Sequence, residues 1–113
     1  AAMRDSLHLQ DRFVIGSIGR MSYAKNQLFL LDCFHEIQQK AENAVLLFVG
    51  DGELEQDIRD RIEGYGIGDK VILTGAVENA EDYLQLMDVF ALPSRFEGLP
   101  CVLIEAQAAV YYV

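Results

Sequence analysis

FVIGSIG, residues 13–19, is the stretch that decides the fold. It is a short run of apolar and β-branched residues that ends in glycine, and similar runs follow at AVLLFVG (44–50), KVILTG (70–75) and DVFALPS (88–94). The apolar residues in these runs are continuous, whereas a strand with one face in water alternates apolar with polar residues. The runs therefore predict strands that are buried on both faces.

Amphipathic helical patterns separate the predicted strands. Apolar residues recur at helical spacing on one face of each segment: Leu30, Phe34 and Ile37; Leu54, Ile58 and Ile62; Ala80, Tyr83, Leu84 and Met87; Val102, Ala106 and Ala109. This alternation predicts an α/β fold, a Rossmann-like parallel sheet with helices on both faces. We expect one such domain at residues 13–113 after a tail or linker at residues 1–12, and the closing AAVYYV is compatible with the start of a fifth strand.

The composition limits the classes of function. Of 113 residues, 51% are apolar and 24% are charged, as in ordinary globular proteins, and the net charge of −9 argues against nucleic-acid binding. No apolar run is long enough to span a membrane and no signal peptide is evident, so we expect a cytoplasmic protein. Cys33 and Cys101 lie in apolar helical patterns without CxxC spacing, so we expect small core residues rather than a disulfide or metal pair. His8 and His35 are isolated, and we expect no metal site.

Ligands in sheets of this class bind beyond the carboxyl ends of the strands, so the loops that follow the strands are the candidate binding segments. In GRMSYAKN, Arg20 and Lys25 lie close to the N-terminus of a helix that is expected to begin near Asn26, and the two cations could converge on a diphosphate. Taken alone the pattern is loose, and two solvated cations explain it more simply. It is neither a Walker loop nor a GxGxxG loop, which argues against classical ATP hydrolysis and dinucleotide redox chemistry.

The loop SRFEGLP carries the most specific chemistry. Its proline suits the first turn of a helix, so the backbone N–H groups of Gly98 and Leu99 would help to form an anion site. Glu97 lies beside this site, and Glu105 lies in the helix where its side chain can point back toward the same crevice. Carboxylates accept hydrogen bonds, so the two acids suit hydroxyl groups of a sugar and a ribose joined by a diphosphate. The alternative is that both acids only favour the helix dipole.

Local structure explains the two remaining loops well enough. GDGE predicts a turn into a helix, with Asp51 or Gly52 near the cap and Glu53 in the first turn. In GAVENAE, a flat base could rest against Ala76 and Val77. Only the position of the loop suggests this contact.

The segments GRMSYAKNQ, VGDGEL, VILTG and DVFALPSRFEGLPCVLIEAQAA, in this order and spacing, resemble the C-terminal donor-binding domain of retaining GT-B glycosyltransferases. The most similar are bacterial family-four enzymes of capsular and exopolysaccharide synthesis. The resemblance covers about residues 13–109. Its most specific part is the E-x7-E signature from Glu97 to Glu105, followed by the GR-x4-K loop; each is weak alone, and both in register are strong.

The resemblance implies a catalytic set of Arg20, Lys25 and Glu97. Arg20 and Lys25 would hold the diphosphate of the donor and stabilise it as a leaving group, in place of the divalent metal that other glycosyltransferases use. Glu97 would bind hydroxyls of the transferred sugar. The family retains the anomeric configuration of the donor, commonly by front-face departure of the nucleotide, and this implies that no metal or other cofactor is required.

The resemblance also implies a donor-binding set. Glu105 would bind the ribose hydroxyls, Gly98 and Leu99 would assist through backbone N–H groups, and Ala76 and Val77 would meet the base. The partner of this domain would be an N-terminal Rossmann domain that carries the acceptor site.

This chain would then be a fragment of a longer hexosyltransferase, inactive by itself, and the full-length enzyme would be cytoplasmic or peripheral at the inner face of the membrane. The chain departs from the family at Val110, where a glycine is usual. Three alternatives remain open: an epimerase-like GT-B domain, a phosphorylase and a non-catalytic nucleotide-binding module. The sequence does not determine the sugar, the base or the acceptor.

Overall fold

The computed structural model describes residues 7, 9–23 and 26–91, and strands and helices alternate along this part of the chain. The elements are β1 (Phe13–Ile18), α2 (Gln27–Lys40), β2 (Ala44–Val49), α3 (Glu55–Tyr65), the 3-10 helix η1 (Gly68–Lys70), β3 (Val71–Leu73), α4 (Ala80–Leu84) and β4 (Val89–Phe90).

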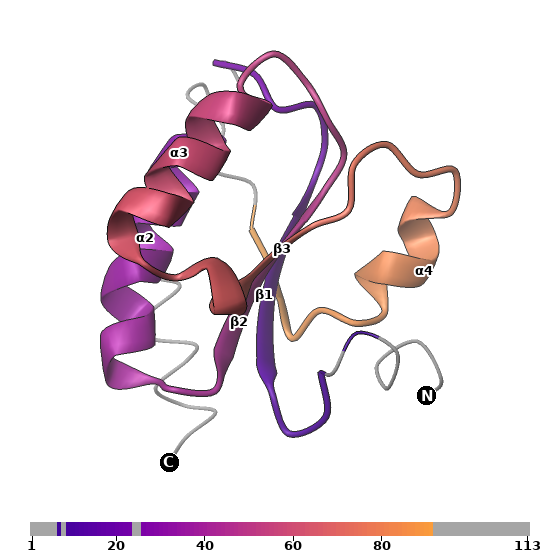
Figure 1. Cartoon of the computed structure of the whole chain (residues 1–113). Helices are drawn as coiled ribbons and strands as arrows, with labels where there is room; N and C mark the ends of the chain where they lie inside the picture. Colours follow the sequence, from indigo (N-terminus) through magenta and orange to yellow (C-terminus); the bar gives the residue numbers. More distant parts are fainter. Residues whose placement is uncertain (1–6, 8, 24–25, 92–113) are drawn as a thin grey trace.

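The strands form one parallel sheet in the order β3-β2-β1-β4. β1 and β2 pair along their whole length, from Phe13 opposite Ala44 to Ile18 opposite Val49. Helices α2 and α3 lie on one face of the sheet and α4 lies on the other (Figure 1). The predicted Rossmann-like fold is therefore confirmed for the described residues. The strand order reverses between β1 and β4, and such a reversal marks the crevice where sheets of this class bind ligands.

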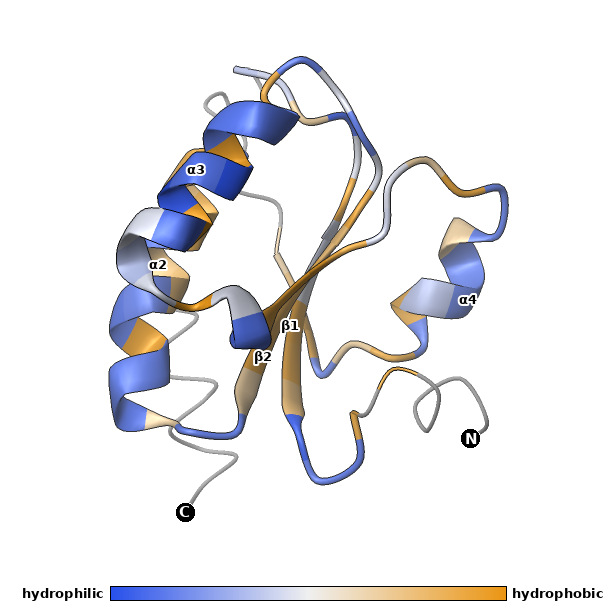
Figure 2. Cartoon of the chain, in the orientation of Figure 1, coloured by the Kyte–Doolittle hydropathy of each residue, from blue (hydrophilic) through white to orange (hydrophobic). Residues whose placement is uncertain are grey.

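Both faces of the two central strands, β1 and β2, are buried, as the continuous apolar runs predict. The prediction is wrong for the outer strands: β3 is only half-buried, and Phe90 of β4 is 43% exposed, because each of these strands lies at an edge of the described sheet. Every residue of β2 is buried, and successive side chains of a strand point to opposite faces. Figure 2 shows apolar strands behind helices whose outer surfaces are polar. The core under α2 and α3 includes Phe13, Ile15, Leu30, Phe34, Leu46, Phe48 and Ile58. The core on the α4 side includes Leu9, Val14, Val45, Leu47, Val49 and Leu86.

A polar cluster joins the exposed sides of α2 and α3. The hydroxyl of Tyr65 donates a hydrogen bond to Asp32 at 2.6 Å, and Arg61 contacts the same carboxylate at 3.0 Å. The Tyr65 ring stacks on His35 with ring centroids 3.9 Å apart. The hydrogen bond to Asp32, then burial, raise the pKa of Tyr65 above its ordinary value of 10.0. This cluster therefore links α2 to α3.

The prediction for the third helix is wrong at its C-terminal end. α4 ends at Leu84, whose side chain is 44% exposed, whereas Leu86 is only 3% exposed. Beyond the helix, the N–H of Leu86 donates to the carbonyl of Tyr83 at 3.0 Å, and that of Met87 donates to Leu84 at 3.1 Å. Bonds between residues three apart wind the chain more tightly than an α-helix does. The inward position therefore moves from Leu84 to Leu86.

Two further expectations need correction. α3 begins at Glu55 with Leu54 at its N-cap, so Glu53 precedes the helix instead of lying in its first turn, and the cap is neither Asp51 nor Gly52. The reason is that the N–H of Leu54 is bonded to the loop after β1, which keeps the preceding residues out of the helix.

The second correction concerns Cys33. It is buried on α2, as expected, but it is disulfide-bonded, because spacing along the sequence does not fix which thiols meet in the fold. Cys101, the predicted fourth helix and the fifth strand lie outside the described residues.

Candidate functional site

Backbone hydrogen bonds hold together the loops at the carboxyl ends of β1, β2 and β3. The N–H of Gly19 donates to Val49 at 3.0 Å, and the N–H of Met21 donates to Asp51 at 2.9 Å. On the other side of β2, the N–H of Gly50 donates to Gly75 at 3.1 Å. The three strand ends therefore form a continuous and hydrogen-bonded rim.

Gly50 allows this rim to close. Its φ is +129°, a conformation that residues with a side chain rarely adopt. A Cβ atom at this position would lie 2.3 Å from the carbonyl oxygen of Gly19, which is backbone and cannot move aside cheaply. The glycine at the end of AVLLFVG is thus required by the close approach of the first two strand ends.

A hollow of about 240 Å³ opens on this rim, on the side of the sheet that carries α4. Its lining residues come from the ends of the first three strands and from the start of α4: Ile18, Gly19, Arg20, Val49, Gly50, Asp51, Ala76, Val77 and Ala80. Three residues predicted from two separate loops, Arg20 from one and Ala76 and Val77 from the other, therefore meet at one hollow. Its wall is apolar, and Arg20 supplies a cation at its edge. Such a hollow can accept a flat group with an attached anion.

The Arg20 side chain is held only loosely. Its Nη2 lies 3.4 Å from Oε2 of Glu53, and the two side chains are 64% and 62% exposed. Exposed ion pairs of this kind contribute little free energy, so an incoming anion can displace Glu53 at low cost. Sequence reasoning missed this role of Glu53, because it placed the residue in the helix and not in the loop opposite Arg20.

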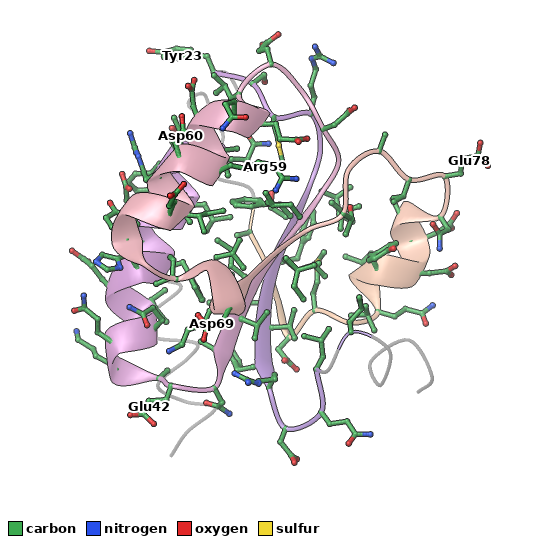
Figure 3. All side chains as sticks on the ribbon, viewed as in Figure 1. Tyr23, Glu42, Arg59, Asp60, Asp69 and Glu78 are labelled. Carbon is green, nitrogen blue, oxygen red and sulfur yellow. The ribbon has the colours of Figure 1, made fainter. Side chains whose placement is uncertain are left out.

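Figure 3 places Tyr23, from the same loop as Arg20, at the end of the molecule where the strands terminate. Glu42 lies at the opposite end, where β2 begins. The exposed loop after β1 thus emerges at the edge of the sheet that carries the hollow.

A second and larger hollow of about 570 Å³ lies elsewhere, between α3 and the edge strand β3. Its lining includes Arg59, Glu63 and Asp69 but none of the residues predicted to bind a ligand. It therefore does not enter the candidate site.

The other predicted site residues, Lys25, Glu97, Gly98, Leu99 and Glu105, lie outside the described residues. Their roles stay predictions. Within residues 7, 9–23 and 26–91, no group of three or more His, Cys, Asp and Glu side chains could hold a metal ion. In the same part of the chain, no helix has the length and apolarity that a membrane crossing requires.

Curated relatives align with most of this chain. The chain is 37% identical over 93 residues to the capsular polysaccharide biosynthesis glycosyltransferase CapH of Staphylococcus aureus, with 79% of this chain and 26% of CapH covered. It is 34% identical over 91 residues to the amylovoran biosynthesis glycosyltransferase AmsD of Erwinia amylovora, with 80% of this chain and 25% of AmsD covered. The chain thus spans about a quarter of the length of these relatives.

Solved structures share the fold. HepE of Anabaena in complex with UDP-glucose matches with a TM-score of 0.75 at 25% identity, over 95% of this chain and 30% of HepE. The C-terminal domain of the group 1 glycosyl transferase LpcC of Francisella tularensis matches with a TM-score of 0.72 at 15% identity, over 93% of this chain and 60% of that one. Residues 12–113 match the family described as glycosyl transferases group 1. The resemblance drawn from the sequence is confirmed, and the chain belongs to the glycosyl transferases group 1 family.

Proposed function

We propose that the protein containing this chain transfers a sugar from a nucleoside-diphosphate sugar to an acceptor, and that this chain is its donor-binding domain. The observation that carries the proposal is the meeting of Arg20 with Ala76 and Val77 at one hollow beyond the carboxyl ends of β1, β2 and β3. A diphosphate needs a cation, and a base needs an apolar surface, and this hollow offers both. HepE, which has the same fold, was solved in complex with UDP-glucose, and this complex supports a donor of this class.

The proposal assigns the diphosphate to Arg20 and Lys25. Their charges would stabilise the negative charge that develops on the leaving nucleotide, so transfer would proceed without a divalent metal. Glu97 would hold hydroxyls of the sugar. The donor's anomeric configuration would be retained in the product.

The remaining contacts place the nucleoside. Ala76 and Val77 line the apolar wall where the base would lie. Glu105 would accept hydrogen bonds from the ribose, and the N–H groups of Gly98 and Leu99 would assist at the phosphates or the sugar.

The names of two relatives support a role of the full-length protein in the synthesis of bacterial polysaccharide. CapH and AmsD are named for capsular polysaccharide and amylovoran biosynthesis. An acceptor site would lie in an N-terminal domain, outside these 113 residues.

Turnover by the full-length protein tests the proposal. A panel of UDP-sugars and other nucleoside-diphosphate sugars is offered with cell-derived acceptors in the presence of EDTA, and the anomeric configuration of the product is read by NMR. We expect release of a nucleoside diphosphate, retention of configuration and no requirement for metal. Arg20→Ala should abolish turnover, while the matched change Arg59→Ala should preserve it, because Arg59 is also exposed and paired but lies outside this hollow. Inversion, metal dependence or full activity of Arg20→Ala would overturn the corresponding part of the proposal.

A further inference from the structure

Gln27, the first residue of α2, has a buried polar side chain that does not line the hollow at Arg20. Its exposed fraction is 2%, and only Ser17 is also a buried polar residue in the part of the chain that the structure describes. Burying an amide costs free energy unless its donors and acceptor are satisfied. A glutamine at this depth therefore needs specific partners.

Its partners are backbone groups of the loop that carries Arg20. The Gln27 Nε2 donates to the carbonyl oxygen of Arg20 at 2.8 Å. The Gln27 Oε1 accepts a hydrogen bond from the N–H of Ser22 at 3.3 Å. The amide thus bridges the two residues on either side of Met21.

Met21 is fixed independently. Its side chain is 1% exposed in the core, and its N–H and carbonyl bond to Asp51 at 2.9 Å and Leu54 at 3.1 Å. Together with the bridge from Gln27, four successive polar groups of the backbone are bound, from the carbonyl of Arg20 to the N–H of Ser22. The backbone at Arg20 is therefore fixed, although its side chain is exposed and loosely paired.

We propose that Gln27 is a positioning residue for the diphosphate contact of Arg20. This inference rests on the proposed function, because it assumes that Arg20 binds the diphosphate of the donor. A preorganised backbone keeps the guanidinium at the edge of the hollow, so that less ordering is needed when the ligand binds. Without the amide bridge, the loop keeps its attachment at Met21 but loses the two bonds that flank it.

The alternative is that Gln27 only stabilises the fold. Two variants separate these roles. Gln27→Met keeps the length of the side chain and removes both hydrogen bonds, while Gln27→Glu keeps the acceptor for Ser22 and removes the donor to Arg20. Gln38→Met is the matched control, because Gln38 is on the same helix and also donates to a backbone carbonyl, that of His35 at 3.0 Å.

The experiment compares the affinities of UDP and UMP for the full-length protein by titration calorimetry, at a temperature below the melting point of every variant. We expect Gln27→Met to lose at most about tenfold in UDP affinity, because Met21 stays fixed and the added cost is that of ordering one long side chain when UDP binds. UMP affinity should change much less, because only the diphosphate reaches Arg20. Gln38→Met should leave the ratio of UDP to UMP affinity unchanged. Gln27→Glu should lower this ratio as well, and it carries the test if Gln27→Met does not fold.

A double-mutant comparison separates failure of this inference from failure of the proposed function. If Arg20→Ala weakens UDP binding and Gln27→Met weakens it further by the same factor with and without Arg20, Gln27 does not act through Arg20 and the inference is overturned. An unchanged ratio of UDP to UMP affinity in both Gln27 variants also overturns it, and the proposed function then stands. If Arg20→Ala leaves UDP affinity unchanged, the assigned phosphate contact itself fails.

Discussion

Glu53 provides a prediction that runs against the usual loss of function on substitution. Its carboxylate pairs with Arg20 at 3.4 Å, and the two side chains are 62% and 64% exposed. A diphosphate that binds Arg20 must displace this carboxylate, or it must bind beside it despite the repulsion between the two negative groups. Neutralising it with Glu53→Gln should therefore strengthen the binding of UDP.

The size of the gain follows from the exposure of the pair. Exposed ion pairs contribute about 0.2–1 kcal/mol, and about 1.4 kcal/mol corresponds to a tenfold change in affinity. The expected gain is thus about 1.4- to 5-fold in UDP affinity. It should shrink as salt is added, because screening weakens interactions between exposed charges.

Titration calorimetry of UDP into the full-length protein measures this gain at low and at high salt. Glu55→Gln is the matched control, since it removes the same charge from another exposed pair, that with Arg59 at 3.2 Å, outside the hollow. Weaker UDP binding by Glu53→Gln, or an equal gain for Glu55→Gln, would refute competition between Glu53 and the diphosphate for Arg20. Equal gains would mean that net charge alone, and not competition for Arg20, sets the affinity.

The remaining predictions concern the scaffold. Gly50→Ala should destabilise the protein by about 1–3 kcal/mol and weaken UDP binding, because φ is positive at this position and the new Cβ would lie 2.3 Å from a backbone oxygen. Gly64→Ala is the control and should be neutral or stabilising, because its Cβ meets nothing within 4 Å. Equal urea midpoints for the two variants would contradict this prediction. Phe34→Ala should cost about 3–5 kcal/mol in chemical denaturation, since Phe34 is fully buried, and a loss below about 1 kcal/mol would show that the core tolerates the cavity. Tyr65→Phe should cost about 1 kcal/mol near neutral pH through the lost bond to Asp32. The raised pKa of Tyr65 favours the protonated phenol in the folded state. The contribution of Tyr65 to the free energy of unfolding is therefore complete below about pH 10 and is lost as pH rises through the folded pKa. Unfolding curves from about pH 8 to 11 should show this alkaline loss of stability in the wild type and not in Tyr65→Phe.

The central strands were predictable because burial on both faces leaves a direct mark on the sequence. Each residue of AVLLFV in β2 is buried, and the run FVIGSI of β1 is almost wholly so. α4 was harder, because a helix of five residues is too short for periodicity to fix its inward face. The outcome at Leu84 and Leu86 depends on hydrogen bonds of the following turn, which no spacing rule reports.

The candidate site was predictable in part. Topology alone brings the loops after parallel strands to one edge of a sheet, which is why Arg20 and the pair Ala76 and Val77 could be placed together. Gln27 and Glu53 could not be found in this way. A glutamine at the start of a helix and a glutamate in a turn are usually solvated, and only the folded loop shows that both contact the residues around Arg20.

The central claim is that the hollow at Arg20 binds the diphosphate of a nucleotide donor. The most direct test is the affinity of UDP for the full-length protein with Arg20→Ala against Arg59→Ala, measured by calorimetry. Loss of a hydrogen-bonded charge contact costs about 1.5–3 kcal/mol, so Arg20→Ala should weaken UDP binding by about 10- to 150-fold while Arg59→Ala leaves it within about twofold of the wild type. Equal affinities for the two variants would contradict the account.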